Sequence, residues 1–524
     1  MSRFNLLDCT LRDGGYINNW KFDYKEICNI IRKLIEAKTD IIEVGFLQNC
    51  EYSRDISLFN SISEVKPILP QNKGNSMYSI MVLHKEYDLS KLEQNDSTVD
   101  IIRTTFHSYE IDEALLFARK IMDKGYKVSC NLINTTGNSD LEILNLIEKI
   151  NNLHPFAFSI VDTFGSMQKT DLLRIYSLVE NNLDKTIIIG LHLHENLGLS
   201  YSLAQYFVDI SSTNRNIIID ASLLGMGKKP GNLCIELMMD YLNQYHTGQF
   251  EINAVYDAID DYIMPIKEKE TWGYTTAFAL SAKYKLHRNY SEYLLGKGKL
   301  RARDINQILA GIEHIKKDVF DMKYIEKLYL EYQNNVIDDT DSKNYLKKIV
   351  NNTKKTLVLA PGNSLNIYKS KVEQYIKEYN PIIISANYDD TLFGAQYNFY
   401  SNIRRYEQYV TNESDKTILI TSNVCKAALQ TSLAFNYYDL ACDEAGLYDN
   451  CVIMLLRLLC ILGVTEITIA GFDGFSESEP NYVNNSPTTP KMNINRENRE
   501  IMNYVSKLRR KVDINFLTPS LYIE

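Results

Sequence analysis

The sequence has no C-x-x-C cysteine pair, no apolar run long enough to cross a bilayer and no excess of positive charge. Its nine cysteines are an odd number, which fits reduced thiols. The most apolar run, residues 451–464 (CVIMLLRLLCILGV), is too short for a membrane span and contains Arg457, so we expect a buried helix there. The opening residues, MSRFNLLDCTLRDGG, carry charges where a secretory leader needs an apolar core. We therefore expect a cytoplasmic protein without a membrane span.

The charge balance restricts the class of partner. Lys and Arg number 57 against 66 Asp and Glu, which gives a formal net charge of −9. This balance argues against a broad surface for nucleic acid and favours a small-molecule partner. With 524 residues, 45% of them hydrophobic, the chain is long enough for two or three packed domains.

Short β-branched runs alternate with helical apolar spacing through the first 225 residues, and this alternation predicts parallel strands joined by crossover helices. Eight strand-and-helix units in about 240 residues match a (β/α)8 TIM barrel in size. The eight expected strands are residues 4–10, 40–46, 78–84, 101–107, 128–134, 156–162, 187–194 and 217–225.

The rest of the chain divides at composition changes. We expect a barrel domain over residues 1–250, a helical extension over 251–350 and a smaller Rossmann-like α/β domain over 355–524. A polar linker is expected within 338–355 and a mobile loop over 476–496, which is rich in Ser, Pro and Asn. The strands predicted for the last domain are residues 356–360, 382–386, 417–421 and 466–471.

Polar residues gather where the barrel strands end, which is the face that carries catalytic groups in such barrels. His192 and His194 are two apart on one strand, so both rings point to the same side. Asp13 follows the first strand and can reach them, since strands one and seven are both odd-numbered. Two imidazoles and a carboxylate make a facial site for a divalent cation, although the histidines could also be ordinary hydrogen-bonded core residues.

Other polar residues suggest the chemistry. Arg12, beside Asp13, can stabilise an enolate oxygen near the metal, and its alternative role is structural. Glu43 lies inside an apolar strand and needs a partner, so we assign it to Arg12 or to support of the site. Asn232 follows a glycine-rich loop (LGMGKKPGN), where it either caps the next helix or reaches the metal.

Five motifs, LLDCTLRDGG, IIEVGF, VDTFG, GLHLHENLGLS and GMGKKPGN, occur in register along the first 240 residues. In this order they resemble the DRE-TIM metallolyase superfamily, and most of all the 4-hydroxy-2-oxovalerate aldolase-like (HMGL-like) proteins. The resemblance implies that Asp13, His192 and His194 hold a divalent metal, with Asn232 at or beside it. Mn²⁺ or Mg²⁺ is favoured, with Zn²⁺ or Co²⁺ as alternatives.

The resemblance also implies an activity. It points to a homo-oligomeric aldolase or lyase that acts on a 2-oxo acid and an aldehyde, with acyl-CoA (Claisen) condensation as the alternative. The aldolases have a histidine two residues after RDG, where this chain has Tyr16. Tyr16 and His107 are therefore the candidate acid/base groups, and Tyr16 would need a lowered pKa to act as a base. A scaffold with a catalytically inactive barrel is a further alternative.

The last domain contains VLAPGNSL over residues 358–365, a strand followed by a glycine turn. We expect Gly362, Asn363 and Ser364 there to receive a phosphate group. With SANY, QYNFYSN and AGFDGF, the domain is distantly similar to Rossmann-like sialyltransferase-type glycosyltransferases of surface glycan pathways. This similarity implies a nucleotide-sugar partner and a bifunctional glycan enzyme. However, all eight histidines lie at or before His314, so the late histidine base is missing, and a domain that serves only assembly is the alternative.

Overall fold

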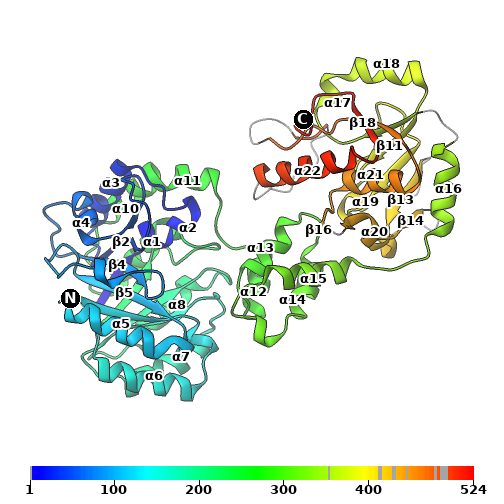
Figure 1. Cartoon of the computed structure of the whole chain (residues 1–524). Helices are drawn as coiled ribbons and strands as arrows, with labels where there is room; N and C mark the ends of the chain where they lie inside the picture. The colour runs from blue at the N-terminus through cyan, green and yellow to red at the C-terminus, as the bar shows by residue number, and fades with distance from the viewer. Residues whose placement is uncertain are drawn as a thin grey trace. The chain divides into compact units, whose positions relative to one another are not determined.

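The computed structural model describes residues 3–351, 355–410, 416–427, 432–443, 446–476, 481–483 and 494–523. The chain divides into two compact units, Met1–Arg288 and Asn289–Glu524. In Figure 1 the first unit runs from blue to green and the second from green to red.

The first unit is a closed barrel of eight parallel strands. β1 pairs with both β9 and β2, which closes the sheet on itself. All eight predicted strands are present, and the (β/α)8 prediction is confirmed. A short strand, β3 (Leu58–Phe59), pairs with the end of β2 in addition. The barrel strands are β1 (Phe4–Asp8), β2 (Ile41–Leu47), β4 (Met77–Leu83), β5 (Ile101–Phe106), β6 (Lys127–Leu132), β7 (Ala157–Asp162), β8 (Ile188–Leu193) and β9 (Ile217–Ala221).

Helices surround the barrel (Figure 1), and each buries an apolar face against the strands. In α3 (Tyr24–Glu36), Asp23 and Glu26 form a capping box at the start, and Ile27, Ile30, Ile31 and Leu34 are buried at helical spacing. The others are α5 (Ile111–Asp123), α6 (Asp140–Leu153), α7 (Lys169–Asn182), α8 (Ser200–Ile210) and α9 (Ile235–Tyr245). Two single turns, α1 (Thr10–Asp13) and α2 (Gly15–Asn18), follow β1, and α4 (Ile62–Val65) follows β3.

The expected helical segment of residues 251–350 is helical, and its helices are shared between the two units. α10 (Ile252–Ala258), α11 (Met264–Lys269) and α12 (Thr276–Lys283) belong to the barrel unit. α13 (Asn289–Gly296), α14 (Ala302–Ala310), α15 (Met322–Gln333) and α16 (Thr340–Asn351) belong to the second. The prediction of a linker within residues 338–355 was wrong over α16, because Leu346 and Val350, one turn apart, are buried in the core of the second unit.

A buried carboxylate joins the helices of the second unit to its sheet domain. Asp449 accepts hydrogen bonds from the Tyr329 hydroxyl (2.7 Å) and the Tyr437 hydroxyl (3.3 Å), and Lys299 Nζ lies 3.0 Å away. Burial alone would raise the pKa of Asp449, but Lys299 and Lys297 hold this pKa well below its usual range.

The second unit contains a parallel sheet of seven strands in the order β14-β13-β12-β11-β10-β17-β18. The predicted α/β domain is therefore present. Four strands, β10 (Thr356–Leu359), β11 (Ile382–Ala386), β13 (Thr417–Thr421) and β17 (Glu466–Ala470), were predicted. β12 (Tyr397–Tyr400), β14 (Leu433–Phe435) and β18 (Asp513–Phe516) were not, since they are short and lack a β-branched aliphatic run. A two-stranded pair, β15 (Cys442–Asp443) and β16 (Gly446–Leu447), is antiparallel.

Helices of the second unit include α21 (Cys451–Ile461), which is buried along most of its length, as predicted for the most apolar run. The others are α17 (Ser364–Ile367), α18 (Lys369–Tyr379), α19 (Ile403–Tyr409), α20 (Tyr437–Ala441) and α22 (Ile494–Leu508). Within the described ranges, no helix combines the length and apolarity that crossing a membrane requires. The mobile loop predicted over 476–496 lies for the most part outside the described residues.

Asp40 joins the first two barrel strands at their amino-terminal ends. It immediately precedes β2, and its carboxylate accepts a hydrogen bond from the backbone N–H of Leu6 in β1 (2.9 Å). Burial raises the pKa of Asp40 to about 6, even though this hydrogen bond favours the ionised form. The fold therefore tolerates the ionised carboxylate at a cost in free energy.

This cost gives a pH dependence. Because the folded-state pKa lies above the unfolded value of about 3.9, the free energy of unfolding should fall as pH rises from about 4 to about 6, by roughly 2 kcal/mol. We expect Asp40→Asn to flatten the profile in that range. Urea unfolding followed by tryptophan fluorescence reports the barrel unit, since both tryptophans, Trp20 and Trp272, lie in it. Asp112→Asn, at an exposed position on α5, is the control and should keep the wild-type slope. Equal slopes in wild type and Asp40→Asn would contradict the assignment.

Candidate metal centre

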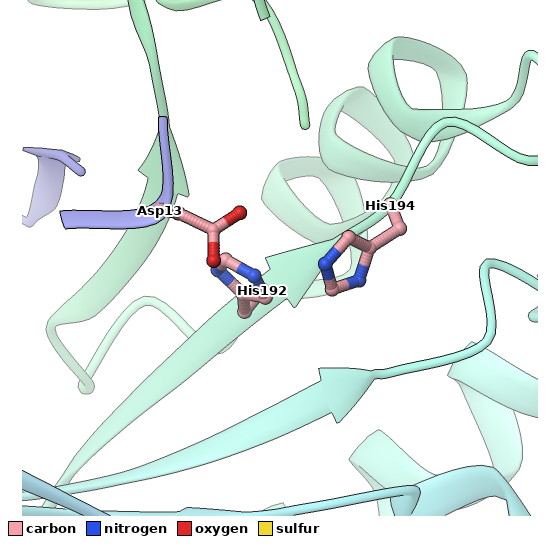
Figure 2. Close-up of side chains that lie close together, drawn as sticks. All are labelled: Asp13, His192 and His194. Atoms are coloured by element: carbon pink, nitrogen blue, oxygen red, sulfur yellow. The ribbon is translucent and has the colours of Figure 1, made fainter. Parts of the chain in front are cut away.

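Three side chains predicted from the sequence come together at the carboxyl-terminal mouth of the barrel. Asp13, His192 and His194 each offer one ligand atom, and these atoms all lie within 4.8 Å of one another. Figure 2 shows the Asp13 carboxylate beside the His192 ring, with His194 just beyond the end of the same strand, β8. The two rings are 4.9 Å apart between centroids and nearly perpendicular, at 80°.

Hydrogen bonds orient both imidazoles toward a shared point. His194 Nδ1 lies 2.9 Å from the backbone carbonyl oxygen of Asp162, which can only accept, so Nδ1 carries the proton. His192 Nδ1 lies 3.0 Å from the Asp220 carboxylate, which requires the same tautomer in a neutral ring. Burial and the neighbouring His192 lower the pKa of His194 to about 3. Both rings can thus offer the lone pair of Nε2 to a cation.

Asn232 lies beside Asp13 and does not cap the next helix, whose N-cap is Cys234. Its Nδ2 donates to Asp13 Oδ2 over 2.8 Å, while its Oδ1 is buried without a hydrogen-bond partner. Gly227 permits this approach, because a Cβ there would lie 2.7 Å from Asp13 Oδ2 and 2.3 Å from Asn232 Nδ2. Of the two roles that the sequence left open for Asn232, its position fits the one at the metal.

Arg12 and Glu43 form the ion pair that the sequence suggested. Arg12 Nε donates to Glu43 Oε2 over 2.7 Å, and Arg12 Nη1 pairs with Asp13 Oδ1. Burial would raise the pKa of Asp13, but Arg12 and the two histidines hold it well below its usual range. Asp13 therefore remains an anion although it is buried.

Two further charged residues, Arg103 on β5 and Asp220 on β9, extend this pair into a chain. Arg103 Nη1 lies 3.1 Å from Glu43 Oε2, and Arg103 Nη2 pairs with Asp220 Oδ2, the same oxygen that holds His192. The buried charges thus lead from one candidate ligand, Asp13, to another, His192. Sequence reasoning missed both residues, although each is a lone charge inside an apolar strand, IIRTTF and IIIDA, and the same signal identified Glu43.

The donor set fits a divalent cation. Three carboxylates and two guanidinium groups occupy the chain, so negative groups exceed positive ones at a buried position. The buried Asn232 Oδ1 adds a neutral oxygen with unused lone pairs. Two nitrogens with oxygen ligands suit Mn²⁺, Co²⁺ or Zn²⁺, and carboxylate oxygens also suit Mg²⁺.

The candidate acid/base groups lie around this centre with different properties. Tyr16 lies in α2, the single turn after α1, and is 38% exposed. Burial of part of its ring, together with the Asp13 carboxylate, raises the pKa of Tyr16 to about 12, so its hydroxyl keeps its proton at neutral pH. His107 follows β5 and stacks on Tyr109 with centroids 5.0 Å apart. A tyrosine that acts as a base needs a lowered pKa, and the surroundings of Tyr16 raise its pKa instead.

The turn predicted to receive phosphate in the second unit already holds a carboxylate. Asp473, after β17, accepts from the backbone N–H of Ser364 over 2.7 Å and pairs with the Ser364 hydroxyl. A Cβ at Gly362 would lie 2.5 Å from Asp473 Oδ2. Asn363 is the residue before α17 and makes no side-chain cap there. The chain's own anion thus occupies the position where an anionic ligand was expected.

Comparison with known proteins agrees with the barrel. The family described as HMGL-like matches residues 90–258. Oxaloacetate decarboxylase of Mycobacterium tuberculosis is 20% identical over 262 residues, which cover 48% of this chain and 74% of that protein. 4-Hydroxy-2-oxovalerate aldolase of Geobacillus genomosp. 3 is 21% identical over 268 residues, which cover 50% of this chain and 77% of that protein.

A solved structure, the N-terminal domain of a Bacteroides vulgatus protein described as an aldolase, is 26% identical with a TM-score of 0.49. The alignment covers 56% of this chain and 96% of that one. The family match over residues 90–258 and the aldolase relatives support the resemblance of the barrel motifs to the DRE-TIM metallolyase superfamily, with an HMGL-like domain in the barrel.

The buried chain of charges should be essential for the stability of the barrel. Arg103→Met leaves Asp220 and Glu43 each with one cationic partner fewer in a water-excluded position, so we expect a loss of about 3–5 kcal/mol in the free energy of unfolding. Arg174→Met breaks a solvent-exposed pair with Asp140 and should cost less than about 1 kcal/mol. Urea unfolding at pH 7 measures both variants, and similar losses in the two would contradict the role of Arg103.

Proposed function

We propose that the barrel is a divalent-metal-dependent lyase that forms or cleaves a carbon–carbon bond of a 2-oxo acid, with an aldehyde as second substrate. The observation that carries the proposal is the convergence of Asp13, His192 and His194 beside the buried Arg12 guanidinium. Relatives named as an aldolase and as a decarboxylase support an enolate-forming reaction.

In this proposal Asp13, His192, His194 and the Asn232 side-chain oxygen would hold the cation. Mn²⁺ or Mg²⁺ is our expectation, and Zn²⁺ or Co²⁺ the alternative. Once bound, such an ion supplies a Lewis acid for the carbonyl oxygen of the 2-oxo acid. Asp220 and the Asp162 carbonyl keep the two imidazoles oriented and their Nδ1 atoms protonated.

Arg12 would stabilise the enolate oxygen. Its Nε and Nη1 are engaged by Glu43 and Asp13, while its Nη2 has no hydrogen-bond acceptor among the described residues. That group can therefore donate to the oxygen on which negative charge develops as the C3 proton or the adjacent carbon leaves. Because the guanidinium is fixed on two sides by ion pairs, little reorganisation accompanies the reaction.

Proton transfer would involve Tyr16 and His107. With a pKa near 12, the Tyr16 hydroxyl is a donor at neutral pH, which suits hydrogen bonding to the aldehyde or alkoxide oxygen. We assign removal of the C3 proton to His107, the second candidate from the sequence. His107 lies at the carboxyl end of β5. Tyr16→Phe should lower kcat for aldol addition more than the rate of C3 proton exchange, since only the addition places a proton on the aldehyde oxygen.

The enolate is common to several reactions of a 2-oxo acid. Oxaloacetate decarboxylation is a second candidate, favoured by the relative that carries this name. It needs no aldehyde and would release the same pyruvate enolate. A panel of 2-oxo acids with aldehydes, with acetyl-CoA or alone separates the aldolase, condensing and decarboxylase reactions by their products.

The direct test measures metal binding and enolate formation together. Wild type should bind Mn²⁺ by calorimetry and exchange the C3 protons of pyruvate in D₂O only with the ion present. Asp13→Asn and His192→Gln should each weaken Mn²⁺ binding by more than about 100-fold, since even the loss of a supporting partner costs 10–100-fold. Exchange should be lost in parallel.

His314→Gln removes an exposed histidine of the second unit and is the matched control. It should keep both properties. Unchanged exchange in Asp13→Asn, or exchange in wild type after complete removal of metal, would refute the proposal.

A further inference from the structure

Cationic side chains gather at the barrel mouth, next to the candidate metal centre. Lys228 is anchored there, because its backbone N–H donates to Asp13 Oδ2 over 3.2 Å. Its Nζ lies 5.2 Å from the centroid of the Tyr16 ring. Lys228 therefore places a positive charge over the residue that we assign to the aldehyde oxygen.

Arg288, in the segment after α12, is anchored to the same loop. Its Nη1 donates to the backbone carbonyl of Lys229 over 2.5 Å, the residue after Lys228. The charge of Arg288 also acts on Tyr16, as does that of Glu86 with the opposite sign. Two long cationic side chains, one from the loop after β9 and one from the segment after α12, thus approach one region.

The pKa of His287, the residue before Arg288, reflects the positive charge at this position. Burial and the charges of Lys228 and Arg288 lower the pKa of His287 to about 4. Both of these side chains are cationic at neutral pH. His287 is consequently neutral at pH 7 and can donate one hydrogen bond without adding charge.

Like charges held together at a partly buried position repel one another, and a bound anion relieves this repulsion. An ammonium and a guanidinium are the side chains that best recognise oxyanions, the guanidinium with two parallel hydrogen bonds. Arg12 is a separate group, because Asp13 and Glu43 already engage it deeper in the barrel.

We propose that Lys228 and Arg288, with His287 beside them, bind an oxyanion group of the aldehyde substrate, either a phosphate monoester or a carboxylate. The inference rests on the proposed aldol function and specifies its substrate class. The anion binds at the mouth, and the aldehyde carbon of the same molecule reaches past Tyr16 toward the metal centre. Neutral aldehydes lack this anchor and are poor substrates.

Equilibrium binding tests the anion site without any reaction. The full-length protein, freed of metal with chelator, is titrated with glycerol 3-phosphate, 4-hydroxybutanoate and neutral glycerol. Tryptophan fluorescence is the readout, since Trp20 contacts the Tyr16 ring edge-on with centroids 4.6 Å apart. We expect at least one of the two anions to bind about 10-fold or more tightly than glycerol, and the stronger of them identifies the oxyanion class.

Variants assign the binding to its residues. Lys228→Met and Arg288→Met should each weaken binding of the anion by roughly 10- to 100-fold, and Arg288→Lys by less. Lys229→Met is the matched control, because it removes a positive charge from the same loop. Lys229 Nζ pairs with Glu270 Oε2 at 3.1 Å and is therefore not expected to bind the anion. This variant should bind the anion within about threefold of wild type. Absence of anion binding to wild type, or equal losses in Lys229→Met, overturns the proposal.

Kinetics separate this inference from the function on which it rests. With pyruvate and Mn²⁺, glyceraldehyde 3-phosphate and succinic semialdehyde are compared with glyceraldehyde and butanal. The ratio of kcat/KM for charged over neutral aldehyde should fall roughly 10- to 100-fold in Lys228→Met and Arg288→Met. Anion binding without any aldol reaction would refute the proposed function alone, whereas reaction with equal use of charged and neutral aldehydes in all proteins would refute the anion site alone.

Discussion

A chain of buried ionic contacts holds the candidate metal centre together. It begins at Asp13, passes through Arg12, Glu43, Arg103 and Asp220, and ends at His192, so both of its ends are candidate ligands. The side chains come from five places in the barrel, the turn after β1 and strands β2, β5, β8 and β9. Because all of these groups are buried, each depends on its neighbours, and the relative position of Asp13 and His192 depends on all of them.

The charges of the barrel are layered. Carboxylates exceed guanidinium groups within the buried chain, which suits a cation, while Lys228 and Arg288 lie at the mouth, which suits an anion. The substrates proposed above fit this arrangement. The reacting carbonyl of the 2-oxo acid would lie beside the cation, and the anionic group of the aldehyde farther out. Gly227 allows both layers to meet, because its backbone passes directly against Asp13 and Asn232.

The sequence predicts the barrel and its three converging ligands because both follow from strict geometry. The apolar periods of strands and helices differ, so the sequence distinguishes the two. The carboxyl ends of parallel strands lie at the same mouth of the barrel, and side chains two residues apart on a strand point to the same side. Long-range pairing does not follow from such rules. The partnership of Arg103 with Asp220 joins residues 117 positions apart, and the occupation of the Ser364 turn by Asp473 joins residues 109 apart. Only the folded chain brings them together.

Local patterns failed where a short element depends on its surroundings. The strand Tyr397–Tyr400 is aromatic and only four residues long, and it is held by parallel neighbours on both sides, β11 and β13. The helix Thr340–Asn351 is mostly polar, and only the burial of Leu346 and Val350 distinguishes it from a linker. In both places tertiary packing decides the conformation over weak local preference.

The order of the candidate ligands along the chain has a consequence for biosynthesis. Asp13 leaves the ribosome before the other three candidate ligands, and His192, His194 and Asn232 emerge only after most of the barrel has been made. A growing polypeptide therefore cannot assemble the full set of donors until its last strand has met its first.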